Sequence, residues 1–139
     1  MTTTIALSEA SATTAGVLLL AIVTIEYGGT FLFRVVSGGV PATEFQKSFF
    51  RAGHAHAGVL VILGLVGTLL VDATQLDGLA RIVARDGVPL GAIAMSAGFF
   101  LSAIGRDRQR PNRLVVLLWL GALSVAAGVV TLGVGLLTA

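Results

Sequence analysis

Apolar residues gather in four long stretches, which are separated by short segments that hold most of the charged residues. A helix that crosses a membrane needs roughly 20 mostly apolar residues. The stretches predict helices at roughly 15–37, 52–71, 88–105 and 114–137. Together they take up most of the 139 residues, so the pattern predicts an all-α fold. We expect an integral membrane four-helix bundle that forms a single transmembrane domain.

The composition agrees with this pattern and narrows the chemistry. Hydrophobic residues make up 55% of the chain and charged residues only 12%, which is too apolar for a soluble globular domain. Cysteine is absent, which excludes disulfides, thiolate catalysis and cysteine-bound zinc or iron–sulfur sites within the chain. The small positive charge lies in short loops, which favours contact with the lipid bilayer over binding of nucleic acid.

Positive charge is distributed unevenly between the two ends of the predicted bundle. Arg34, Lys47 and Arg51 flank the first loop, whereas the second loop holds Arg81 and Arg85. The third loop adds four arginines, which are also candidates for binding anionic lipid: Arg106, Arg108, Arg110 and Arg113. Because cytoplasmic loops are enriched in Lys and Arg, we expect the first and third loops in the cytoplasm. Both termini would then lie on the non-cytoplasmic side of the cell (inner) membrane.

The segments before and between the helices are interpreted as structural. Asp77 and Arg81 are four residues apart, which favours a short interfacial helix in the second loop. The other charged residues of that loop are interpreted as solvated: Asp72, Arg85 and Asp86. Pro89 is expected in the first turn of the third helix, where its missing N–H does no harm. Residues 1–16 lack the charged start and the cleavage site of a secretory signal, so we expect the first helix to be retained.

Glycine recurs every seven residues in two of the predicted helices: Gly91, Gly98 and Gly105 in the third, and Gly121, Gly128 and Gly135 in the fourth. A seven-residue repeat keeps one stripe of a helix facing a neighbouring helix. Small residues in that stripe let membrane helices approach closely. The repeats therefore predict close helix packing, either within one chain or between copies of an oligomer.

A short run near the start of the second helix holds both histidines of the chain, His54 and His56. Glu26 lies near the middle of the first helix. Ionisable groups inside a membrane are costly and often functional, so we predict a buried polar site of Glu26, His54 and His56. Arg34 and Arg51 would lie at its cytoplasmic rim as further ligand or proton-relay candidates.

Helix geometry limits how these residues can meet. Two residues two positions apart differ by about 200° around a helix, so His54 and His56 cannot both face one target from a regular helix. We assign His56 to the bundle interior and His54 to another helix, lipid headgroups or another subunit. Glu26 should lie roughly 12 Å deeper than Arg34 at 1.5 Å per residue, which makes a contact between Glu26 and His56 reasonable.

Several chemistries are open to this set. His54, His56 and Glu26 could bind a transition metal as two imidazoles and one carboxylate, provided that the first turn of the helix unwinds. Haem held by two axial histidines would need a second chain, because both histidines lie on one helix. Glu26 and His56 could instead relay protons. No catalytic residue is assigned.

The segment His54-Ala55-His56-Ala57-Gly58-Val59-Leu60 resembles the His-x-His entrance of small four-helix membrane proteins that are distantly similar to haem–copper oxidase subunit I. In the large oxidases, histidines on several helices bind haem and copper, so the resemblance implies a haem or transition-metal cofactor. This chain has no further histidine to match the ligands on the other helices. Arg51-Ala52-Gly53-His54 is also similar to the segment that opens the second helix of four-helix glutathione and eicosanoid enzymes, with one glycine inserted.

These observations favour a non-catalytic membrane protein. We expect an accessory or assembly subunit, or a module that binds a cofactor or small molecule, in a larger membrane complex or a homo-oligomer. The alternative is a proton-coupled transporter, or a haem or metal redox protein, that uses the same residues.

Overall fold

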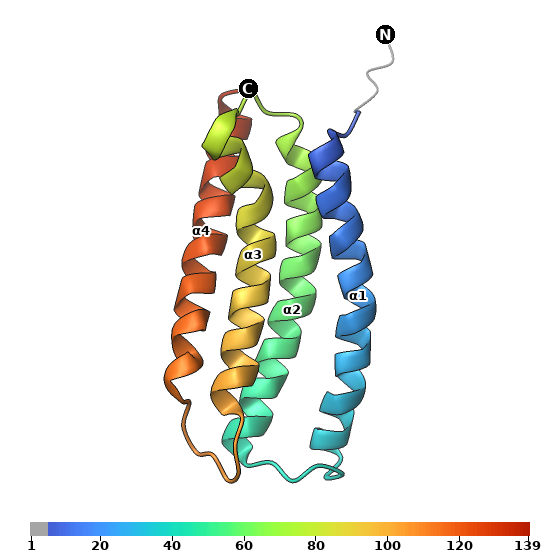
Figure 1. The fold of residues 1–139 in the computed structure, drawn as a ribbon, viewed down its shortest axis with the longest axis vertical. Helices are drawn as coiled ribbons and strands as arrows, with labels where there is room; N and C mark the ends of the chain where they lie inside the picture. Colours follow the sequence, from blue (N-terminus) through green and yellow to red (C-terminus); the bar gives the residue numbers. More distant parts are fainter. Residues whose placement is uncertain (1–5) are drawn as a thin grey trace.

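The computed structural model describes residues 6–139 and places four long α-helices side by side in chain order (Figure 1). The helices are α1 (Glu9–Val36), α2 (Glu44–Val71), α3 (Gly78–Ala103) and α4 (Val116–Leu137), and a short 3₁₀ helix, η1 (Arg113–Val115), leads into α4. Each long helix is apolar enough to cross a membrane. No strand occurs in the described residues, so the predicted all-α, four-helix architecture is confirmed.

Three helices, α1, α2 and α3, begin well before the apolar stretches that predicted them. α2 starts at Glu44 because Thr43 and Gln46 form a capping box. The Thr43 hydroxyl accepts from the Gln46 N–H at 3.2 Å, and the Gln46 side chain accepts from the Thr43 N–H at 3.1 Å. These bonds satisfy donors that a helix start otherwise leaves free. Hydrophobic length thus marks the apolar part of a helix and not its ends.

The start of α3 corrects two predictions. The described second loop contains no separate interfacial helix, because Asp77 is the N-cap position of α3 and Arg81 lies inside that helix. Arg81 forms its ion pair with Asp72 and not with Asp77. Pro89 lies well inside α3 and not in its first turn, where it removes an N–H that would otherwise bond to the carbonyl of Arg85.

α3 and α4 pack through a glycine seam, as the seven-residue repeats predicted, and the seam lies within one chain. A Cβ added to Gly91 would lie 2.7 Å from the carbonyl oxygen of Gly121, so the two backbones touch. The Ser124 hydroxyl donates to the carbonyl of Gly87 at 2.7 Å across the same seam. Gly105 does not take part, because it follows the end of α3 with a φ of +132°.

Gln46 links the start of α2 to the C-terminal end of α3 by hydrogen bonds. Its amide nitrogen donates to the carbonyls of Ala103 at 2.9 Å and Gly105 at 2.8 Å. The last carbonyls of a helix lack partners within that helix, so the buried Gln46 amide satisfies both the start of α2 and the end of α3.

α1 is the least enclosed of the four helices. Among the described residues it packs mainly on α2, touches α3 only slightly and does not reach α4. The two helices lie at opposite edges of the molecule (Figure 1). Only Ser11, Ala15, Leu18 and Val35 of α1 are buried. The bundle is therefore open on the α1 side, which leaves space between α1 and α3.

Candidate functional site

The five residues predicted to form one polar site are not brought together by the structure. Glu26 lies on an exposed side of α1, and Arg34 and Arg51 are exposed as well. No salt bridge of these three is found within residues 6–139. His54 and His56 are half-buried and face different helices.

His56 packs against α3. Its ring centroid lies 4.9 Å from that of Phe99, and its Nδ1 lies 2.8 Å from the carbonyl oxygen of Ala52. Because a carbonyl only accepts, this contact needs the proton on Nδ1 and leaves Nε2 of the neutral ring as an acceptor. The neighbour of His56 is thus an aromatic ring and not Glu26.

His54 faces α1, one of the orientations expected for it. A Cβ added to Gly29 would lie 3.6 Å from Nε2 of the ring, so the ring lies against glycine backbone. Within the described part of the chain, no three histidine, aspartate or glutamate side chains are grouped closely enough to hold a metal ion. The set of two imidazoles and one carboxylate is therefore not assembled here.

A groove of about 420 Å³ lies between α1 and α3, with α2 as its floor. Its walls are mainly apolar and include Val17 and Leu18 on α1, Val61 on α2, and Leu90 and Ile93 on α3. Sites for small molecules are typically apolar clefts of about 300–1,000 Å³ with a few placed polar groups. The groove has the size and the character of such a site.

One end of the groove carries an ion pair. Asp86 lines this end, and Arg85 binds its carboxylate with two hydrogen bonds of 2.9 and 2.7 Å. The Thr14 hydroxyl, from α1, donates to the same carboxylate at 3.3 Å. This contact joins α1 to α3 at the mouth of the groove. The structure thus corrects the sequence interpretation, which places Asp86 and Arg85 in a solvated loop.

Ser96 marks the other end of the groove. Its hydroxyl is buried and has no hydrogen-bond partner among the described residues. A buried polar atom without a partner is costly, so a ligand that supplied a donor or acceptor here would be favoured. His54 lies one helical turn beyond Ala57, the residue of α2 that lines this end. The histidine run predicted as a site thus borders the groove without lining it.

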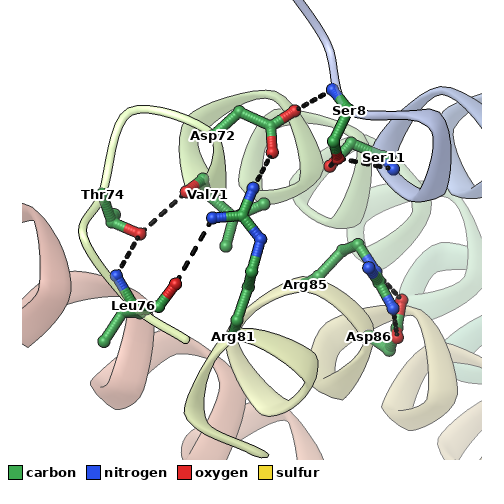
Figure 2. Close-up of polar contacts among 9 residues, drawn as sticks. All are labelled: Ser8, Ser11, Val71, Asp72, Thr74, Leu76, Arg81, Arg85 and Asp86. Carbon is green, nitrogen blue, oxygen red and sulfur yellow. Dashed lines mark hydrogen bonds and ion pairs between the residues drawn. The ribbon is translucent and has the colours of Figure 1, made fainter. Parts of the chain in front are cut away.

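A second polar cluster joins the ends of three helices (Figure 2). Asp72, at the end of α2, accepts from the backbone N–H of Ser8 at 2.8 Å and pairs with Arg81 of α3. Its side chain is only 4% exposed, whereas the sequence interpretation expected solvated charges. Burial raises the pKa of Asp72, but hydrogen bonds from Ser8 and Ser11 and the charge of Arg81 outweigh it and hold that pKa below 3.8.

The arginines of the third loop remain candidates for lipid contact. Arg106, Arg110 and Arg113 are exposed. Arg108 is partly held, because its Nε donates to the carbonyl of Ile104 at 3.0 Å and its own carbonyl accepts from the Thr43 hydroxyl. The loop is thereby fastened to the start of α2 and presents its other three cations outward.

Similarity to known proteins does not assign this chain to a family. Comparisons with protein-family models, with curated proteins and with solved structures give no match for this chain. A function must therefore be inferred from the geometry of the groove and of the charged residues around it.

Proposed function

We propose that this chain is a multi-pass membrane protein that binds an elongated, mostly apolar amphiphile in the groove between α1 and α3. The observation that carries the proposal is an apolar groove of about 420 Å³ with a polar group at each end. Such a protein would act as a binding module, alone or as an accessory subunit of a larger membrane complex.

The dimensions of the groove support a long ligand. Its α1 wall extends from Thr13 to Ile25, which is roughly 18 Å along a helix axis. A chain of methylene or isoprenoid units would cover the apolar wall and gain about 25 cal/mol for each Å² of apolar surface removed from water. Ser96 would meet a polar atom within the ligand or at its tail.

The ligand headgroup would meet the opposite end. This end places hydrogen-bond donors and acceptors close together, namely the Arg85–Asp86 pair and the Thr14 hydroxyl. Because the two charges already neutralise each other, this end suits a dipolar or hydroxylated headgroup better than a strongly charged one. A bare anion would have to compete with Asp86 for Arg85.

Membrane orientation belongs to the same proposal. The loop with Arg106, Arg110 and Arg113 would lie at the cytoplasmic surface, where anionic lipids attract Lys and Arg. The Asp72–Arg81 cluster and both termini would lie on the non-cytoplasmic side of the cell membrane. The headgroup end of the groove would then face the non-cytoplasmic leaflet.

Photolabelling of the protein in nanodiscs tests the binding proposal. A long-chain alcohol that carries a diazirine should label peptides of α1, α2 and α3 that line the groove, and an excess of unlabelled alcohol should suppress the labelling. Ala57→Phe fills the floor of the groove and should reduce labelling several-fold. Ala127→Phe, on an exposed side of α4, is the matched control and should leave labelling unchanged.

A second variant tests ligand binding without filling the groove. Ser96→Ala removes a hydroxyl that has no hydrogen-bond partner among the described residues, so it should leave unfolding almost unchanged while weakening the binding of a ligand that uses this hydroxyl. A hydrogen bond contributes about 0.5–1.5 kcal/mol. Labelling that spreads evenly over the exposed surface of α4, or that is the same in both phenylalanine variants, would show that the groove binds nothing selectively.

A further inference from the structure

Glu26 presents a carboxylate on an exposed side of a helix that is apolar enough to cross a membrane. It takes part in no hydrogen bond or salt bridge that the described residues form. The hydroxyls of Thr24 and Thr30 on the same helix, in contrast, each donate at 2.7 Å to the backbone carbonyl three residues earlier. Charged side chains within membrane helices almost always face protein and pair with another group. Glu26 therefore calls for a partner outside the contacts of the single chain.

Contacts between α1 and α2 set the depth of Glu26. Leu18 packs on Gly64 and His54 packs on Gly29, so α1 and α2 run antiparallel in a register that places Glu26 level with His56. Glu26 lies ten residues before the end of α1 at Val36, which is roughly 15 Å along the helix. A glutamate side chain is much shorter than that distance, so the carboxylate cannot reach the end of α1.

Arg51 lies on the same face of the α1–α2 pair as Glu26. Thr24 lines the groove, and Glu26 follows it by about 200° around the helix, on the side of α1 away from the groove. Arg51 and Ala55 line a different hollow, of about 740 Å³, and Ala55 is likewise about 200° from Ala57 of the groove floor. Both charges thus occupy the face opposite the groove, which we call the outer hairpin face.

The two charges differ in depth by a distance that long side chains can span. The rings of Phe31 and Phe50 lie 5.5 Å apart, which places Arg51 level with the α1 segment at Phe31 and Leu32. Arg51 is therefore about 8 Å nearer than Glu26 to the α1–α2 loop, measured along the helices. No ion pair between Glu26 and Arg51 of one chain is formed in the described residues.

We propose that a second copy of this chain docks on the outer hairpin face, and that Glu26 of each chain pairs with Arg51 of the other. Copies that insert with one orientation are related by a two-fold axis along the membrane normal, which preserves depth. Such an interface is isologous and must be self-complementary. The outer hairpin face meets this requirement because it carries one carboxylate and one guanidinium, each without a hydrogen-bond or ion-pair partner among residues 6–139. Exposed apolar residues flank the pair, including Leu19 and Ile62.

Charge exchange in co-expressed chains tests the dimer directly. Two differently tagged wild-type copies should co-purify in mild detergent. Glu26→Arg and Arg51→Glu each create like-charge contacts in a homodimer, so either variant alone should lose co-purification. When an E26R chain is expressed with an R51E chain, both contacts become complementary again, and co-purification should return.

The mixed pair distinguishes a dimer from pairing within one chain and from lipid binding. If Glu26 and Arg51 paired within one chain, only the double variant E26R/R51E would recover, and the mixed pair would not. If Arg51 bound a lipid phosphate instead, Arg51→Glu would not be rescued by any change at Glu26. Failure of wild-type copies to co-purify would point to a different protein as the partner. Each of these three results would overturn the proposal.

Two controls keep the result interpretable. Glu9→Arg changes an exposed carboxylate in the first turn of α1, far from the outer hairpin face along the helix, and should leave co-purification unchanged. Helix content measured by circular dichroism should match the wild type in every variant, because Glu26 and Arg51 are exposed in the single chain. The labelling of the groove should also persist in the variants, since the groove lies on the opposite face.

Discussion

At the residue scale, α3 and α4 can lie close together because glycines at their contact have no Cβ atom. A Cβ added to Gly121 would lie 2.6 Å from the backbone nitrogen of Met95, and one added to Gly98 would lie 2.5 Å from the backbone nitrogen of Leu118. These positions meet backbone, which cannot rotate away as a long side chain can. Glycine is therefore required by close approach here, and not by backbone conformation.

Gly121→Ala should destabilise the protein because the added methyl group forces the two helices apart. Overpacking of this kind costs typically about 1–3 kcal/mol. Gly133→Ala is the matched control on the same helix, because a Cβ there meets no atom within 4 Å. Thermal unfolding of both variants in one detergent measures the difference. Equal unfolding temperatures would mean that α3 and α4 are not held together at this seam.

Gln46 should be the most sensitive polar residue at the α1–α2 loop end. Gln46→Ala removes two bonds to the end of α3 and one to Thr43. The carbonyl of Ala103 is buried, and a buried carbonyl left without a donor costs about 1–3 kcal/mol, so the unfolding temperature should fall clearly. Gln109→Ala, at an exposed position of the third loop, provides the comparison and should have almost no effect. A similar loss in both variants would contradict the role of Gln46.

At the element scale, the helix ends depend on side chains that bridge neighbouring helices. Asp72 joins the end of α2 to the start of α1 through Ser8 and to α3 through Arg81 (Figure 2). Asp86 of α3 makes a similar link to α1, because its carboxylate accepts hydrogen bonds from Arg85 and from Thr14 of α1. α1 touches α3 only slightly elsewhere, so the Thr14–Asp86 bond is a direct link between two helices that share few other contacts.

The low pKa of Asp72 predicts a loss of stability in acid. Well above pH 3.8 its carboxyl is ionised in both the folded and the unfolded chain, and its contribution to stability is complete. As the pH falls below 3.8, the unfolded chain takes up the proton first, so stability declines and is lost below the folded pKa. The unfolding temperature of the wild type should therefore drop more steeply in acid than that of Asp72→Asn. Asp77→Asn, at an exposed position, should follow the wild-type curve.

Much of the architecture could be predicted from the sequence, because hydrophobic length and glycine spacing act over whole helices. The start of α2 could not, since Thr43 and Gln46 act through local bonds that an apolar pattern does not contain. The start of α3 at Gly78 lies among polar residues that precede its apolar stretch, so the apolar pattern does not locate it either. The Thr43-x-x-Gln46 spacing was the signal that could have located the start of α2. The groove could not be predicted either, because it depends on how α1 stands relative to α3.

None of the residues predicted as a site lines the groove, and the reason is geometrical. The sequence shows which ionisable residues are unusual in a membrane helix, but it does not show which way each one faces. Glu26 and His56 lie at one depth, yet Glu26 is exposed while the ring of His56 packs against that of Phe99. Ser96 gave no signal, since one serine in an apolar helix is ordinary. Its importance arises only because its hydroxyl lines the groove without a partner among the described residues.

At the scale of the whole molecule, two opposite faces of the α1–α2 pair carry different roles in our proposals. One face forms the groove with α3, and the other holds Glu26 and Arg51 for a second copy. A dimer built on the outer hairpin face would leave both grooves free, so ligand binding and dimer formation should vary independently. The labelling and co-purification experiments together measure this independence.

The groove opens sideways between α1 and α3, and this affects how the binding of a ligand should be measured. Leu90 and Ile93 at its edge are exposed on a helix that can cross a membrane, so an amphiphile would enter by lateral diffusion within the bilayer. Occupancy would then follow the mole fraction of ligand among the lipids, and not its concentration in the buffer. Diluting the membrane with inert lipid at fixed total ligand should empty the groove, whereas diluting the aqueous phase should not.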